Sequence, residues 1–174
     1  PSEQGIYTWP MVPCSGKAED VLDRIEAAVS AALAAGPQGP LPEASATPGA
    51  GVCLNAPVVP VILGGEHTVT LGVLRALKKR YGHFGVVQFD AHADLRDRYE
   101  GTPYSHACVM RRAVDDLGLA LFQVGVRSLC PEEVAFRREN AIPHLDSRAA
   151  RFPLPPTSGS DVPCFRRIFP ARSF

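Results

Sequence analysis

The sequence has no excess of charge of either sign and no long apolar run. Its 18 lysines and arginines balance 18 aspartates and glutamates, so the formal net charge is zero. This balance argues against a basic surface for nucleic acid or acidic lipid. No apolar run approaches the roughly 20 residues that a membrane-spanning helix needs, and no signal peptide is recognisable. We therefore expect a cytoplasmic protein that binds neither nucleic acid nor a membrane.

Cysteine is scarce, and no Cys-x-x-Cys pair occurs. The cysteines are odd in number and widely spaced, which argues against both a disulfide framework and a thiolate zinc site. Cys108 and Cys130 have no charged partner close by in the sequence, so we interpret them as small buried residues and not as nucleophiles. The five cysteines are Cys14, Cys53, Cys108, Cys130 and Cys164.

Proline is also scarce in the middle of the chain, although the whole chain has 17. Only Pro103 and Pro131 lie between residues 61 and 142, so we expect ordered elements there and a surface loop over 37–57. Residue patterns predict helices over 17–35, 68–80, 105–116 and 131–140, the last from a proline at a favourable first position. Short apolar runs predict strands over 58–63, 85–89, 119–126 and 142–145. This alternation predicts an α/β fold in which a mostly parallel sheet is covered on both faces.

Ligand-capable side chains follow two of the predicted strands. Asp90, His92 and Asp94 would point to one side if the chain stayed extended past residue 89. Gly64 and Gly65 allow a tight turn after the preceding strand, which would bring His67 beside them. Taken singly, each residue is more simply a turn cap or a core histidine. Together they predict a divalent metal site, and carboxylates with imidazole but no thiolate suit Mn²⁺ better than structural zinc.

Other histidines carry weaker signals. His106 lies near the start of a predicted helix, where it could transfer protons beside a metal-bound hydroxide. A helix-start histidine without such a role is an equally good interpretation of its position. We interpret His83, in a glycine-containing connection, and His144, in a short strand, as structural.

Four segments resemble one known family. They are GGEHTVTLG at 64–72, VVQFDAHADLRDRYEG at 86–101, YSHACVMRRA at 104–113 and QVGVRSL at 123–129. From about residue 17 to about residue 145 the chain is similar to the amino-terminal portion of the ureohydrolases (arginase and agmatinase), and most to agmatinase. The resemblance implies a three-layer α/β/α fold, two Mn²⁺ ions and a cytoplasmic homo-oligomer acting in polyamine biosynthesis. It also implies attack of metal-bound hydroxide on a small guanidino substrate, with agmatine giving putrescine and urea. Guanidinobutyrate and arginine follow agmatine as candidate substrates.

The resemblance also implies roles for individual residues. His67 and Asp94 would hold one metal ion, His92 would hold the other, and Asp90 would bridge the two. His106 matches the histidine that transfers a proton to the leaving amine.

One motif of the family is missing. The family carries a later Asp-x-Asp-x-x-Asp-Pro motif, but no Asp-x-Asp occurs in this sequence. We expect residues 1–174 to form a single incomplete ureohydrolase domain, with 37–57 as an insertion and 146–174 as an irregular tail left by a truncation or frameshift near Ile168. The second metal site would be incomplete, and the chain would be poorly stable and nearly inactive.

Two other classes compete with a ureohydrolase. A non-catalytic degenerate homologue, acting as a scaffold or oligomer partner, would explain the missing carboxylates. A binuclear metallophosphoesterase also uses Asp-x-His at a strand end. That class needs Gly-Asp-x-x-Asp and Gly-Asn-His afterwards, and neither follows Asp94.

Overall fold

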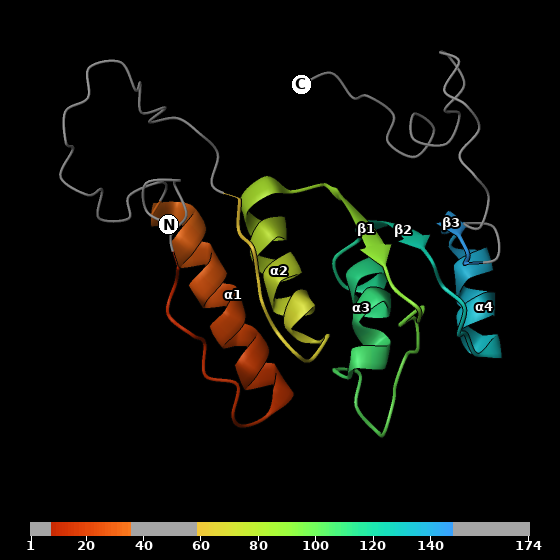
Figure 1. Cartoon of the computed structure of the whole chain (residues 1–174), viewed down its shortest axis with the longest axis horizontal. Helices are drawn as coiled ribbons and strands as arrows, with labels where there is room; N and C mark the ends of the chain where they lie inside the picture. Colours follow the sequence, from red (N-terminus) through yellow and green to blue (C-terminus); the bar gives the residue numbers. More distant parts are fainter. Residues whose placement is uncertain (1–7, 36–58, 148–174) are drawn as a thin grey trace, which may run out of the picture. The chain divides into compact units, whose positions relative to one another are not determined.

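The computed structural model describes residues 8–35 and 59–147 (Figure 1). The chain divides into two compact units, residues 1–82 and residues 83–174. The predicted insertion at 37–57 lies outside the described residues, as does the predicted tail from residue 148 onwards. Within the described ranges, none of the helices is long and apolar enough to cross a bilayer.

The first unit is built on two helices, α1 (Ala18–Ala35) and α2 (Val69–Tyr81), close to their predicted bounds. Leucine, isoleucine and valine recur every three or four residues along α1, so one face of the helix is apolar and becomes buried. Three basic residues fill the last turn of α2, where they meet the negative end of the helix dipole. This helix ends at Gly82, whose φ of +73° suits glycine.

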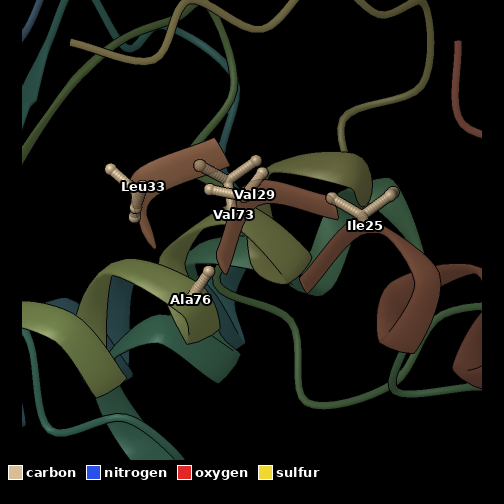
Figure 2. Packing of buried hydrophobic residues seen from close by; sticks show 5 residues of the cluster. All are labelled: Ile25, Val29, Leu33, Val73 and Ala76. Atoms are coloured by element: carbon tan, nitrogen blue, oxygen red, sulfur yellow. The ribbon is translucent and has the colours of Figure 1, made fainter. Parts of the chain in front are cut away.

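A small apolar core joins the two helices (Figure 2). Its members are Ile25, Val29 and Leu33 of α1 and Val73 and Ala76 of α2. The helices approach closely at Gly72, where an added Cβ would lie 2.9 Å from both the Cβ of Ile25 and the carbonyl oxygen of Leu22. Glycine is therefore the residue that this helix crossing accommodates.

The predicted first strand is absent from the part of this unit that the structure describes. Residues 59–63 form no strand, and Val59, Val61 and Leu63 are 75%, 81% and 93% exposed. A strand exists only where a neighbouring strand completes its hydrogen bonds. Among its described residues the first unit contains helices and loops only, so the apolar run finds no such partner there.

The second unit contains a parallel sheet in the order β1-β2-β3. Its strands are β1 (Gly85–Phe89), β2 (Ala120–Val124) and β3 (His144–Leu145). They confirm the second, third and fourth predicted strands, each over the same length or a shorter one. Gln88 of β1 lies directly opposite Gln123 of β2, and Gln123 lies opposite His144 of β3.

Two helices connect these strands. The predicted helix at 105–116 is divided into a 3₁₀ turn, η2 (His106–Cys108), and α3 (Val109–Asp115), and α4 is Pro131–Glu139. The guanidinium of Arg111 on α3 lies 3.7 Å from the ring centroid of Phe136 on α4, so the two helices are neighbours. Val87 and Phe89 of β1 remain 37% and 79% exposed.

Candidate metal site

The segment Asp90–Asp94 leaves the carboxyl end of β1. The amide of Asp90 continues the ladder by donating to the carbonyl of Val124 (3.1 Å), and His92 forms a parallel bridge with Ser128. The backbone N–H of His92 donates to Oδ1 of Asp90 at 2.9 Å. Asp90 is thus a turn cap, and this bond fixes the orientation of its carboxylate.

Two neighbouring elements hold the backbone of this segment. The amides of Arg127 and Ser128, which follow β2, donate to the carbonyl of Ala91 at 2.9 and 3.0 Å. The amides of Met110 and Arg111, in the first turn of α3, donate to the carbonyl of Asp94 at 3.0 and 3.1 Å. The loop is therefore fixed by the next strand end and by a helix amino terminus.

Asp94 departs from the extended backbone that the sequence predicts. Its φ is +53°, in the left-handed region that aspartate tolerates better than most residues, and its side chain is buried at 6% exposure. An oxygen of its carboxylate still lies within 4.8 Å of one from Asp90. Strained backbone of this kind is concentrated at functional sites, where the surrounding structure holds it.

His92 is neither buried nor part of a core. Its side chain is 66% exposed, and Nδ1 lies 3.4 Å from Oδ1 of Asp90. The interpretation of His92 as a satisfied core histidine is therefore wrong. An exposed imidazole beside a carboxylate can act as a metal ligand or, when protonated, as an ion-pair partner.

His67 belongs to the first unit. It stands in the turn before α2, where the carboxylate of Glu66 accepts hydrogen bonds from the N–H and the hydroxyl of Thr68 at 2.8 and 2.9 Å. His67 is half-buried and, with Ile62 and Val73 among others, lines a hollow of about 280 Å³ in this unit. Its membership of a metal site with Asp90 and Asp94 stays a prediction.

His106 is exposed on η2. Its ring packs edge-on against Tyr99, with the centroids 5.5 Å apart, and Nδ1 lies 3.4 Å from the hydroxyl of Ser105. The proton-transfer role of His106 also stays a prediction.

Sequence reasoning missed a buried acid that supports the loop. Glu133 in the first turn of α4 is 5% exposed, and its carboxylate accepts from the amide of Leu95 at 3.0 Å and from the amide of Cys130 at 2.8 Å. The second of these bonds is half of a helix capping box. Glutamate two residues after a helix-starting proline is a signal that could have identified Glu133 as a cap. Its bond to Leu95 depends on tertiary structure.

The donor set fits a hard divalent cation. Two carboxylates and an imidazole, without a thiolate, are ligands that suit Mn²⁺ or a related ion. The fold and this site together define a class: a parallel α/β protein with a candidate divalent-metal centre at its strand ends.

Comparison with known proteins narrows that class. A model of the Arginase family matches residues 2–152, and the chain belongs to this family. It is 47% identical to an N(1)-aminopropylagmatine ureohydrolase of Thermococcus kodakarensis over 98 residues. These residues make up 56% of this chain and 32% of that protein. It is 38% identical over 99 residues to an agmatinase of Pyrococcus horikoshii, which covers 57% of this chain and 33% of that protein.

A solved structure carries the same fold. Agmatine ureohydrolase of Thermoplasma volcanium aligns with a TM-score of 0.59 at 34% identity, over 78% of this chain and 39% of that chain. The predicted resemblance and the arginase-like α/β fold are thereby confirmed. The chain spans about a third of the length of the curated relatives it matches, at 32% and 33% of those named above.

Proposed function

We propose that the chain is a Mn²⁺-dependent hydrolase of a guanidino compound, and that agmatine, giving putrescine and urea, is the first candidate substrate. The observation that carries this proposal is the pair of carboxylates of Asp90 and Asp94. Each offers an oxygen within 4.8 Å of the other, on a loop that hydrogen bonds hold in place. The names of the relatives, an agmatinase and an N(1)-aminopropylagmatine ureohydrolase, support the substrate class. Guanidinobutyrate and arginine are the further candidates.

Each site residue has a proposed role. His67 and Asp94 would hold one ion, His92 would hold the other, and Asp90 would lie between them. When bound, such ions act as Lewis acids and lower the pKa of water towards neutrality. His106 is exposed, so it can exchange a proton with solvent and pass it to the departing amine.

We expect weak turnover from this chain. The sequence contains no Asp-x-Asp, so the second ion would have only Asp90 and His92 as ligands. The first ion would keep three ligands, including the buried Asp94. Binding of one ion with slow hydrolysis is therefore the expected behaviour of the 174-residue chain.

Metal binding is the first test. Isothermal titration calorimetry with MnCl₂ should show binding to the wild-type chain and a loss of at least about 10-fold in affinity for Asp90→Asn and for Asp94→Asn. Asp116→Asn is the matched control, because Asp116 is an exposed aspartate at the end of α3 that pairs with Arg112 (3.2 Å). Equal affinity of all four proteins for Mn²⁺ would refute the metal site.

Urea release is the second test. Agmatine, N(1)-aminopropylagmatine, guanidinobutyrate and arginine should be compared with and without Mn²⁺. We expect slow, Mn²⁺-dependent urea release that is greatest with agmatine and is abolished in Asp94→Asn. A chain that binds Mn²⁺ but releases urea from none of the four compounds would be the non-catalytic homologue instead.

A further inference from the structure

Four polar side chains form a buried line through the second unit. They are Arg137 of α4, Gln123 of β2, Gln88 of β1 and Asp94, and their exposed fractions are 6%, 0%, 6% and 6%. The two glutamines are register partners on neighbouring parallel strands, so their side chains lie on the same face of the sheet. Burying polar groups is costly unless they are hydrogen-bonded to one another, and here each contacts the next.

The direction of these hydrogen bonds is determined by Arg137. A guanidinium can only donate, and Nε and one terminal nitrogen of Arg137 both donate to Oε1 of Gln123, at 3.1 and 3.0 Å. The amide nitrogen of Gln123 must therefore face the other way. It donates to Oε1 of Gln88 at 2.6 Å and to the carbonyl of Ala93 at 2.7 Å.

The same logic fixes the second amide. Because Oε1 of Gln88 accepts from Gln123, its amide nitrogen faces the loop. It lies 3.4 Å from Oδ2 of Asp94 and 3.3 Å from the carbonyl of His92, and donates to both. Every hydrogen bond in the line therefore has its donor on the Arg137 side and its acceptor on the Asp94 side. Because Arg137 can only donate, the group that faces the carboxylate of Asp94 is an N–H.

The far end of the line is anchored as well. The remaining terminal nitrogen of Arg137 donates to both carboxylate oxygens of Asp146, at 3.0 and 3.3 Å. Asp146 directly follows β3. The guanidinium therefore cannot turn away from Gln123 without breaking a two-oxygen ion pair.

We propose that Arg137 is a positioning residue for Asp94, acting through Gln123 and Gln88. The line presents a hydrogen-bond donor to Oδ2 of Asp94, which holds this carboxylate in one rotation beside Asp90. The proposal rests on the proposed function, in which Asp94 is a metal ligand. Hydrogen bonds that orient a ligand in this way contribute strongly to metal affinity, and their loss costs roughly 10- to 100-fold.

The variant Gln123→Glu tests the proposal, because simple electrostatics and the proposal predict opposite changes in Mn²⁺ affinity. Glutamate keeps the size of the side chain and the acceptor for Arg137, but an ionised carboxylate cannot donate to Gln88. The Gln88 amide would then reverse and turn its oxygen towards Asp94. An added negative charge by itself should strengthen Mn²⁺ binding, whereas the proposal predicts weakening of roughly 10-fold or more by calorimetry.

Gln88→Leu removes the donor to Asp94 and leaves the bond between Arg137 and Gln123 in place. We expect a similar loss of Mn²⁺ affinity. Arg137→Met should weaken Mn²⁺ binding and Arg137→Lys should recover part of the affinity, because lysine retains a donor. Arg112→Met is the control: Arg112 is another largely buried arginine in an ion-pair cluster, bonded to Asp97 at 2.6 Å, and its loss should leave Mn²⁺ affinity unchanged.

A second measurement does not depend on the metal. In the metal-free wild-type chain, the side-chain amide protons of Gln88 and Gln123 should exchange slowly with solvent by NMR. In Gln123→Glu the Gln88 amide resonances should shift, because the reversed amide then donates to the new carboxylate. If Asp94→Asn leaves Mn²⁺ affinity unchanged, the proposed function fails, and this exchange measurement alone decides whether the line exists. Wild-type Mn²⁺ affinity in both Gln88→Leu and Gln123→Glu, or fast exchange of both amides in the wild type, would overturn the inference.

Discussion

Cys108, the last residue of η2, is fully buried at 0% exposure. Burial raises the pKa of its thiol above the ordinary value of 9.0, and this effect outweighs the lowering by the backbone at Ser105 and by the charge of Arg112. A buried thiol with a raised pKa stays protonated and is a poor nucleophile. The prediction that Cys108 is a small buried residue and not a nucleophile therefore agrees with its surroundings.

The raised pKa of Cys108 has a consequence for stability. Below pH 9.0 the thiol is protonated in both the folded and the unfolded chain, so its full contribution to the free energy of unfolding is present. Above that pH only the unfolded thiol ionises, and the free energy of unfolding should fall by up to about 1.4 kcal/mol per pH unit until the folded pKa is reached. Urea denaturation of both proteins across this range should show a steeper decline in the wild type than in Cys108→Ala. Parallel pH profiles would contradict the prediction.

At the scale of elements, the packing of α1 against α2 depends on a single small residue. Gly72 lies within α2, where alanine would normally be the better helix former. The structure leaves no space for a methyl group, because Ile25 and the backbone of Leu22 would each be 2.9 Å away. Helix propensity and packing therefore make opposite demands at this position.

We expect packing to prevail in Gly72→Ala. The propensity gain is about 1 kcal/mol, whereas overpacking against backbone costs typically about 1–3 kcal/mol, so the variant should be less stable by thermal unfolding. Gly65→Ala is the control, since no atom lies within 4 Å of the added carbon and its backbone is outside the left-handed region. A higher melting temperature for Gly72→Ala than for the wild type would show that the helices can move apart at no cost.

At the scale of the whole molecule, each unit has apolar side chains that are exposed to solvent. Val61 and Leu63 are exposed in the first unit, and Phe89 at 79% in the second. Apolar residues that are exposed in groups promote association, whereas single ones are common on soluble proteins. The predicted single domain, homo-oligomer and cytoplasmic location stay predictions.

These exposed groups predict that the purified chain binds apolar dyes and self-associates. Val61→Ser and Phe89→Ser should each lower the fluorescence of bound anilinonaphthalene sulfonate and reduce the sedimentation coefficient at high concentration. Val134→Ser on α4, also exposed at 53%, is the matched control and should change both signals less. A chain that is monomeric and dye-free at all concentrations would show that these side chains are covered in solution.

The sequence by itself determined the elements whose causes are local. Apolar periodicity located α1 and α2, the proline at a favourable first position indicated α4, and short apolar runs located β1, β2 and β3, because these signals are local to the chain. The spacing of Asp90, His92 and Asp94 also sufficed to indicate a carboxylate-rich cluster. Only the tertiary structure decided what depends on distant partners.

Residues 59–63 are apolar but form no strand, because pairing needs a neighbour that a local pattern does not supply. Asp94 takes a left-handed backbone conformation in which its carbonyl accepts hydrogen bonds from amides in the first turn of α3. Gln88 and Gln123 are polar residues in otherwise apolar strands. The sequence does not indicate their hydrogen-bond partners, because Arg137 of α4 becomes a neighbour of Gln123 only in the folded chain. A buried hydrogen bond joins residues that the fold, and not the sequence, makes neighbours.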